Sequence, residues 1–434
     1  MDRLREALGR SAGRTFAALR NRNYRLYFVG QIISVSGTWM QGVAQAWLVL
    51  RLTDSGVALG TMLAAQFLPV LLIGPAGGLV ADRVDKHRLL LATQTVSGLL
   101  ALTLGVLTAT GVVELWMVYV LAAGLGLVHA IDNPARQTFV PEMVGPELVT
   151  NAVSLNSVVM NASRVVGPGI AGILIATVDI APCFFINAAS YLAVLAALLL
   201  MRRADLQRAE LATRSPGQLR AGFRYVWSTP ALRTPLLMMA AVGTLAYEFQ
   251  VTLPLMARFE FDAGAGAFGA MSSLMGAGAV VGGLVSASRG GPTSRRLTGS
   301  AVAFGLLILV VAAMPTLALE LVALPVMGAA SITFIAMANS TLQLTAEPAM
   351  RGRVMALYAV AFLGSTPVGA PIVGAIGEAF GPRSALAVGG AATVLAGLIG
   401  ARSLARHERG PAPDDAAPAA PAGAGVDLAA DQPA

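Results

Sequence analysis

Long apolar stretches separated by short polar turns constrain this chain more than any other feature. A helix that crosses a bilayer needs about 20 mostly apolar residues. Twelve stretches meet that requirement, at residues 26–50, 57–80, 89–110, 112–132, 152–177, 181–201, 234–257, 264–287, 297–315, 317–340, 352–376 and 383–404. Backbone polar groups need internal hydrogen bonds in lipid, so each stretch is expected to be a helix. The sequence predicts an all-α membrane protein with twelve transmembrane helices.

The composition agrees with a lipid environment and excludes several function classes. Hydrophobic residues make up 56% of the 434 residues and charged residues 12%, against about 25% charged in soluble domains. The net charge is +7, but the basic residues fall between apolar stretches, so we expect no nucleic-acid binding. One cysteine, Cys183, and three scattered histidines offer no metal-ligand spacing. We expect no catalytic residues, no metal and no cofactor.

The basic residues also predict the orientation of the chain. If both termini are cytoplasmic, 26 of the 30 Lys and Arg residues lie on the cytoplasmic side and three on the other, with Arg164 inside a span. Basic residues concentrate on the cytoplasmic side of membrane proteins. The N-terminus lacks the features of a cleavable signal. We therefore expect a multi-pass protein of the plasma (inner) membrane, by default a monomer.

A half-chain repeat divides the chain into two bundles of six helices. Gly77-Gly78-Leu79-Val80 recurs as Gly282-Gly283-Leu284-Val285, and residues 166–172 resemble residues 368–374 at nearly the same offset. Two repeated bundles around a central cavity are a transporter architecture. The predicted divisions are an amphipathic N-terminus at 1–25, bundles at 26–201 and 234–404, a central loop at 202–233 and a disordered tail at 405–434.

The turn after the second span carries the first family resemblance. Its pattern, Gly78-x-x-x-Asp82-Arg83-x-Asp85-Lys86-x-Arg88, resembles the signature of the major facilitator superfamily, with Asp85 where that signature usually has glycine. Together with twelve spans and the repeat, the resemblance implies two pseudo-symmetric six-helix bundles that rock about a central site. Its expected partners are the lipid bilayer and a small-molecule cargo.

A second motif resembles the drug:proton antiporters. Gly167-Pro168-x-x-Ala171-Gly172 in the fifth span is similar to their antiporter motif, with alanine in place of one glycine. The segments 21–28, 37–50 and 132–141 resemble the branch that contains enterobactin exporters and macrolide efflux proteins. This resemblance covers about residues 15–405. It implies export of amphipathic small molecules, drug, macrolide or siderophore-like, in exchange for protons.

The first motif suggests a conformational latch. Asp82 is expected to accept hydrogen bonds from a neighbouring helix or arginine in one conformation and to release them in the other. Candidate partners are Asp132 and Arg136, an i,i+4 pair. Without a latch, the basic residues would only anchor the turn in the cytoplasm. The latch candidates are Gly78, Asp82, Arg83, Lys86, Arg88, Asp132 and Arg136.

The antiporter-like motif is expected to pack the fifth span on the eighth. Pro168 interrupts helix hydrogen bonding, and Gly167 and Gly172 permit close approach of another backbone. Small surfaces on the eighth span are Gly276, Gly278, Gly282 and Gly283. The packing would either seal the protein against proton leak or be ordinary helix packing.

Polar and aromatic side chains inside the spans are candidates for the substrate cavity. The first span carries a stripe at helical spacing, and the fifth span carries a similar one that includes Asn161. Either stripe lines a cavity or forms hydrogen bonds between helices. The cavity candidates are Gln31, Ser34, Thr38, Gln41, Gln45, Asn161, Tyr247, Tyr358 and Phe362.

Two charges inside spans, Glu248 and Arg164, are candidates for proton coupling. A carboxylate within a span favours its protonated form, so Glu248 is a possible proton carrier or a structural partner of Arg164. The favoured hypothesis is a proton-coupled exporter. The alternatives are a nutrient importer or facilitator on the same fold, or a non-transporting membrane sensor or scaffold.

Overall fold

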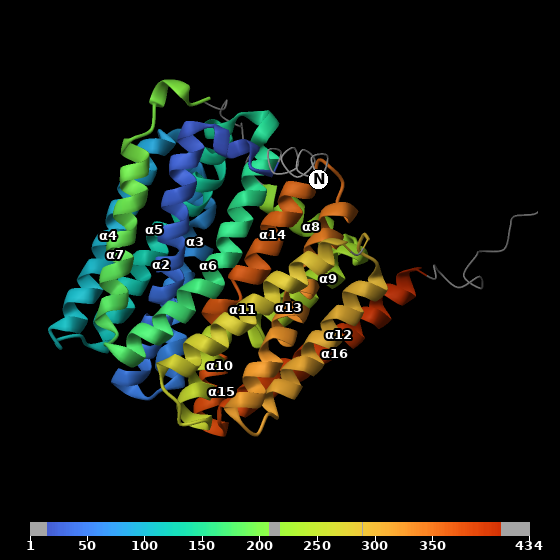
Figure 1. The fold of residues 1–434 in the computed structure, drawn as a ribbon. Helices are drawn as coiled ribbons and strands as arrows, with labels where there is room; N and C mark the ends of the chain where they lie inside the picture. Colours follow the sequence, from blue (N-terminus) through green and yellow to red (C-terminus); the bar gives the residue numbers. More distant parts are fainter. Residues whose placement is uncertain (1–14, 208–217, 289, 409–434) are drawn as a thin grey trace, which may run out of the picture.

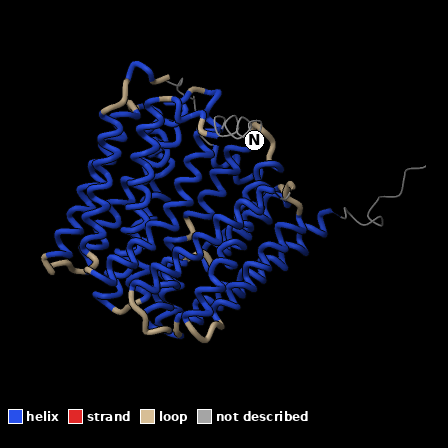
Figure 2. Tube along the Cα trace, viewed as in Figure 1, coloured by secondary structure: helices blue, strands red, loops and turns tan. Residues whose placement is uncertain are grey.

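The computed structural model describes residues 15–207, 218–288 and 290–408 (Figure 1). The side chains of a few helical residues, Gly78 and Asp82 among them, are also outside the description. Most of the predicted tail and of the N-terminal segment, and part of the central loop, are likewise outside it. The described part is helical throughout, with loops only between helices (Figure 2).

Fifteen α-helices and several short helical turns make up this part of the chain. The α-helices are α2 (Arg22–Thr53), α3 (Gly56–Arg83), α4 (Lys86–Ala109), α5 (Leu115–Val144), α6 (Val149–Thr177), α7 (Ala181–Leu199), α8 (Gln218–Ser228), α9 (Pro230–Leu245), α10 (Phe249–Leu255), α11 (Ala265–Ser288), α12 (Ser294–Ala312), α13 (Leu317–Thr345), α14 (Arg351–Leu363), α15 (Thr366–Phe380) and α16 (Pro382–Glu408). A π-helical turn, Met256–Glu260, continues α10.

Eleven stretches of the described chain are long and apolar enough to cross a membrane. They match the predicted spans from the second to the twelfth. The first predicted span is α2, whose polar stripe lowers its hydropathy. At 32 residues it is about 48 Å long, which exceeds the hydrocarbon thickness of a bilayer. It packs against α6 and α7, as a member of the bundle.

The helix ends differ from the predicted boundaries where capping residues decide them. Asn21 accepts hydrogen bonds from the backbone N–H groups of Asn23 and Tyr24, so α2 begins before residue 26. Asp85 caps α4 by accepting the Arg88 N–H at 3.1 Å. This cap gives a structural reason for an aspartate in the place of the usual glycine, since Asp is a favoured N-cap residue.

Two predicted spans are broken helices. The seventh consists of α9 and α10, separated at 246–248, and the eleventh consists of α14 and α15, separated at Gly364 and Ser365. Each was predicted as one continuous helix, so both breaks were missed. Pro367 lies in the first turn of α15, just after the second break, where a proline is tolerated. The prolines of the seventh span lie inside α9 and α10 and not at their break. The helix α8, predicted as a surface helix within the central loop, is present.

The helices form two bundles that lie side by side in Figure 1, α2–α7 in one and α9–α16 in the other. The end of the molecule that carries the α3–α4, α5–α6, α11–α12 and α13–α14 connections is here called the basic end. It includes Arg83, Lys86, Arg203, Arg295 and Arg351. The other end is called the opposite end.

The sequence repeat corresponds to a repeated packing contact. A Cβ atom added to Gly77 on α3 would collide with the backbone of Ala130 on α5. A Cβ added to Gly282 on α11 would collide in the same way with Ala329 on α13. The two related glycine segments therefore allow equivalent helices in each bundle to pack backbone against backbone.

Candidate functional site

The bundles meet near the opposite end through two related helix crossings, of which the first joins α6 and α11. A Cβ added to Gly172 would lie 3.0 Å from the Cα of Gly269. A Cβ added to Gly269 would lie 2.6 Å from the carbonyl oxygen of Pro168. Only residues without a side chain permit this approach. The antiporter-like motif thus packs on the eighth span, while Gly167 faces Trp39 on α2 within its own bundle.

The second crossing joins α15 to the beginning of α3. A Cβ on Gly56 would lie 2.6 Å from the carbonyl oxygen of Gly374, and one on Gly60 would lie 2.8 Å from the Cα of Pro371. Gly374 is the counterpart of Gly172 in the half-chain repeat. The two crossings are therefore related by the same internal symmetry as the bundles.

Polar contacts between the bundles support the second crossing. Glu378 on α15 accepts hydrogen bonds from the Ser55 hydroxyl at 2.6 Å and from the Val57 N–H at 3.0 Å. Beside them, Arg258 forms an ion pair with Asp54 at 3.0 Å. These contacts lie at the opposite end, where the bundles are in close contact.

The small surfaces predicted on the eighth span divide between two partners. Gly276 lies against the backbone of Arg164 on α6, as predicted. Gly278 and Gly282 instead face α13, and Gly283 has open space around its Cβ position. Positions two apart on a helix point in nearly opposite directions, so Gly276 and Gly278 cannot share one partner. The prediction that these glycines pack on the fifth span was therefore wrong for Gly278, Gly282 and Gly283.

A buried ionic network occupies the first bundle toward the basic end. Asp132, 2% exposed, forms an ion pair with Arg136 and accepts hydrogen bonds from Thr93 at 2.5 Å and Gln94 at 2.8 Å. Arg136 also donates to Gln31 on α2. The network joins three helices, α2, α4 and α5. The predicted i,i+4 pair is thus present, and the Asp132 carboxylate already has an ionic partner and two hydrogen-bond donors within the first bundle.

The residues predicted as a latch lie in several environments. Lys86 forms a mostly buried ion pair with Glu142 on α5, at 2.5 Å. Arg83 and Arg88 are exposed. Gly78 and Asp82 belong to α3, and the role of the Asp82 carboxylate as a latch stays a prediction.

The polar stripe of α2 is largely buried between helices. Gln41 accepts a hydrogen bond from Asn187 on α7 at 2.6 Å, and the Gln45 amide lies 3.4 Å from the Met62 sulfur. Ser34 is buried, and Thr38 donates to the Ser34 carbonyl oxygen at 3.0 Å. The hydrogen bonds of Gln31 and Gln41 show that this stripe connects helices of the first bundle.

The polar stripe of α6 is more exposed toward the basic end than toward the opposite end. Ser157 is exposed, Asn161 and Arg164 are half-buried and Pro168 is buried. Their spacing places them on one helix face. The guanidinium carbon of Arg164 lies 5.0 Å from the centre of the Trp39 ring. This face is therefore exposed at Ser157 and buried at Pro168, next to the crossing with α11.

Glu248 lies at the break between α9 and α10 and is 3% exposed. Its Oε1 atom is buried without a hydrogen-bond partner. The Thr366 side chain interacts with the carboxylate, and a Cβ on Gly369 would lie 3.0 Å from Oε1. Glu248 therefore faces the beginning of α15, at the other helix break. Within the described residues it forms no ion pair with Arg164, so the structural pairing considered from the sequence is not formed.

The aromatic cavity candidates come together in the second bundle. Tyr247 packs edge-on against Phe362, with ring centres 5.2 Å apart, and Phe362 stacks on Tyr358 at 6.2 Å. The Tyr247 hydroxyl lies 3.4 Å from that of Ser331. These side chains form one cluster, in which Tyr358 and Phe362 come from α14, Ser331 comes from α13 and Tyr247 comes from the break that also holds Glu248.

Two buried acids were missed from the sequence. Glu320 on α13 is fully buried, and both carboxylate oxygens lack a hydrogen-bond partner. It lies in the predicted span 317–340, so a search for every charge within a span would have found it. Glu142 lies after the predicted end of the fourth span. No sequence signal marked it, because α5 continues through Pro141 to Val144.

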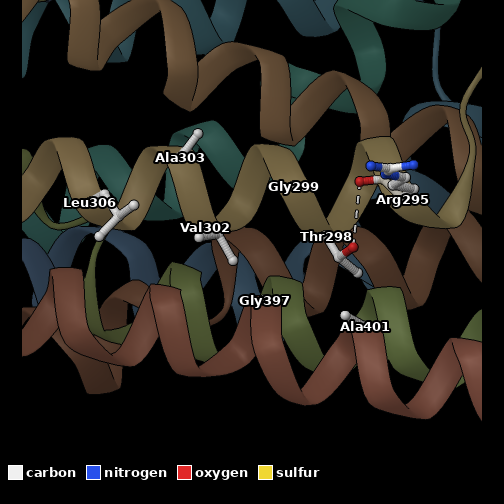
Figure 3. A pocket seen from close by; sticks show the side chains of 8 residues that line it. All are labelled: Arg295, Thr298, Gly299, Val302, Ala303, Leu306, Gly397 and Ala401. Carbon is white, nitrogen blue, oxygen red and sulfur yellow. Dashed lines mark hydrogen bonds between the residues drawn. The ribbon is translucent and has the colours of Figure 1, made fainter.

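An open groove between α12 and α16 is separate from these residues (Figure 3). It lies on the outside of the second bundle, near the exposed Leu306 and Leu398. Small and apolar side chains line most of it, and Arg295 lies at one end. None of the predicted site residues contributes to this groove.

Comparison with known proteins defines the class. The transmembrane secretion effector family matches residues 13–421, so the chain belongs to this family of major facilitator superfamily transporters. The fold agrees with a solved structure of a bacterial homolog to the human lysosomal transporter Spinster in an inward-facing, unoccupied conformation. The TM-score is 0.70 at 14% identity, over 89% of this chain and 97% of that one.

Curated relatives include exporters. The multidrug efflux pump Tap of Mycolicibacterium fortuitum is 28% identical over 80% of this chain and 87% of its own. The enterobactin exporter EntS of Citrobacter koseri is 24% identical over 87% and 90%. The staphyloferrin A transporter of Staphylococcus aureus is 30% identical over 38% of this chain. The chain spans about half the length of two relatives, 42% of the staphyloferrin A transporter and 51% of the transporter YfiS of Bacillus subtilis.

Proposed function

We propose that the protein is a secondary exporter that moves amphipathic small molecules out of the cell in exchange for protons. The basic end faces the cytoplasm in this proposal, as the distribution of basic residues favours. The crossings near Gly172 and Gly374 then close the extracellular side. Transport requires them to separate while the basic end closes.

The observation that carries the proposal is the position of Glu248. A carboxylate buried among protein groups without a cationic partner is costly when charged, and protonation removes most of that cost. Glu248 lies where the breaks of two helices meet, and discontinuous helices form the ion and substrate sites of other transporters. In the proposed cycle Glu248 takes a proton from the outside and releases it to the cytoplasm.

Export against a concentration gradient needs a driving force, which the inward movement of protons supplies. One elementary charge that crosses 100 mV provides about 2.3 kcal/mol. The names of the relatives support export, since Tap is a multidrug efflux pump and EntS an enterobactin exporter. The exposed beginning of the α6 stripe, which includes Asn161, is proposed to admit cargo.

The test uses inverted membrane vesicles that contain the protein, with a pH gradient imposed across them. Siderophores, macrolides and amphipathic dyes serve as cargoes. The proposal expects uptake into the vesicles that requires the gradient and stops when a protonophore collapses it. Uptake that is indifferent to the gradient would support a facilitator, and absence of uptake for every cargo would contradict the proposal.

A further inference from the structure

We propose that Arg164 binds an acidic group of the cargo, so that the transported class is amphipathic acids. This inference rests on the proposed export function and names its substrate class. Arg164 projects from α6 next to the crossing that joins the bundles. Its guanidinium lies over the ring of Trp39, and its Nε atom is buried without a hydrogen-bond partner.

Several other arginines in the described part of the chain form an ion pair with a carboxylate, whereas Arg164 does not. Arg136 pairs with Asp132, Arg383 with Glu260, Arg258 with Asp54 and Arg51 with Asp179. In the described part of the chain no carboxylate pairs with Arg164. A guanidinium has five N–H donors and no acceptor, and the Trp39 ring offers it only a cation–π contact. A ligand carboxylate would satisfy both its charge and its donors.

A cargo that enters from the basic end would reach Arg164 along α6. On this helix face the crossing with α11 covers Gly172 and Pro168, and Gly276 lies against the Arg164 backbone. Toward the basic end, Asn161 is half-buried like Arg164, and Ser157 is exposed. Arg164 is therefore the last charged group on this face before the closed crossing.

The second bundle offers Arg164 an aromatic surface, and none of its described carboxylates pairs with Arg164. Tyr247 interacts electrostatically with Arg164, and it belongs to the aromatic cluster with Phe362. The Glu248 carboxylate faces Thr366 and Gly369 instead. An acid with an aromatic or apolar body would contact Arg164 on one bundle and aromatic rings on the other.

The test separates binding from transport. Calorimetry on the purified full-length protein measures binding of the amphipathic acid dansylglycine and of its neutral amide. Charge-assisted hydrogen bonds contribute about 1.5–3 kcal/mol, which corresponds to at least about 10-fold tighter binding of the acid. Arg164→Gln should remove this preference, and Arg164→Lys should retain part of it, because lysine keeps the charge without the planar fork. Size-exclusion profiles establish that the variants are folded.

Each result decides the inference. Equal binding of acid and amide by the wild-type protein, or no binding of the acid, would overturn it. An equal loss of both ligands in Arg164→Gln would also overturn it, because that result indicates only a structural role. Selective binding of the acid without proton-driven uptake in vesicles would uphold the site and contradict the export function. Proton-driven uptake without preferential binding of the acid would support the export function and contradict the proposed role of Arg164.

Discussion

A Cβ atom on Gly172 would lie 3.0 Å from the Cα of Gly269, so α6 and α11 cross with their backbones almost in contact. This distance leaves no room for a larger side chain unless the helices separate. The crossing is one of two symmetry-related contacts that hold the bundles together at one end. Alternating access requires that both form and break in each cycle.

Gly172→Leu should therefore hold the crossing apart. Overpacked interfaces typically cost about 1–3 kcal/mol, so we expect a lower melting temperature in detergent and at least 10-fold slower export in vesicles. Gly283→Leu is the matched control, because its Cβ position on α11 has open space. Normal export by Gly172→Leu would show that the close crossing is dispensable.

Asp132→Asn should destabilise the first bundle strongly. It leaves the Arg136 guanidinium next to a neutral amide, and removal of one partner of a buried ion pair typically costs about 3–5 kcal/mol. Thermal unfolding monitored by circular dichroism measures the effect. The double variant Asp132→Asn/Arg136→Gln should be more stable than Asp132→Asn alone, since it no longer holds an unpaired charge. A single variant within 1 kcal/mol of the wild type would contradict the importance of this network.

The ion pair of Asp179 with Arg51 is an exposed counterpart of the buried pair of Asp132 with Arg136. Its carboxylate accepts a hydrogen bond from the backbone N–H of Ile180 and pairs with Arg51, and these contacts lower its pKa. A lowered pKa in the folded state stabilises the protein above the unfolded-state value, near 4, and the stabilisation is lost as the pH falls through the folded-state pKa. Asp179→Asn should leave stability at pH 7 within about 1 kcal/mol of the wild type, because both side chains are half exposed. A larger loss at pH 7, or a loss that is greater at pH 3 than at pH 7, would contradict the exposed ion pair.

A disulfide across the second crossing should stop transport. The hydroxyl of Ser55, the N-cap residue of α3, lies 2.6 Å from the carboxylate of Glu378 on α15, so Ser55→Cys and Glu378→Cys place two thiols on facing segments of the two bundles. The background is Cys183→Ala, which removes the one native cysteine. Oxidation should abolish vesicle uptake and reduction should restore it. Continued transport by the fully cross-linked protein would show that this crossing does not open.

The sequence was sufficient for the architecture because apolar length and repeated motifs are local signals. The glycine repeat predicted related segments, and Gly77 and Gly282 indeed occupy equivalent helix contacts. The pairing of Asp132 with Arg136 followed from i,i+4 spacing. The contact of Gly172 with the eighth span followed from the family resemblance.

The remaining features depend on contacts between distant segments. The breaks beside Glu248 and Ser365 adjoin each other, and apolar length gives no sign of them. The partner of Lys86 is Glu142, 56 positions away. Glu320 was overlooked although it lies within a predicted span. The contact of Gly278 with α13 depends on how α11 is rotated about its own axis, and the sequence repeat does not determine that rotation.

Proton-driven uptake by Glu248→Gln, measured in inverted vesicles with an imposed pH gradient, distinguishes a proton-carrying Glu248 from a structural one. Glutamine keeps the shape of the side chain but carries no exchangeable carboxyl proton. This variant is expected to lose uptake against a gradient yet still exchange cargo between equal concentrations, whereas Glu320→Gln, the matched buried acid, should retain both. Full proton-driven uptake by Glu248→Gln would show that Glu248 is not the proton carrier.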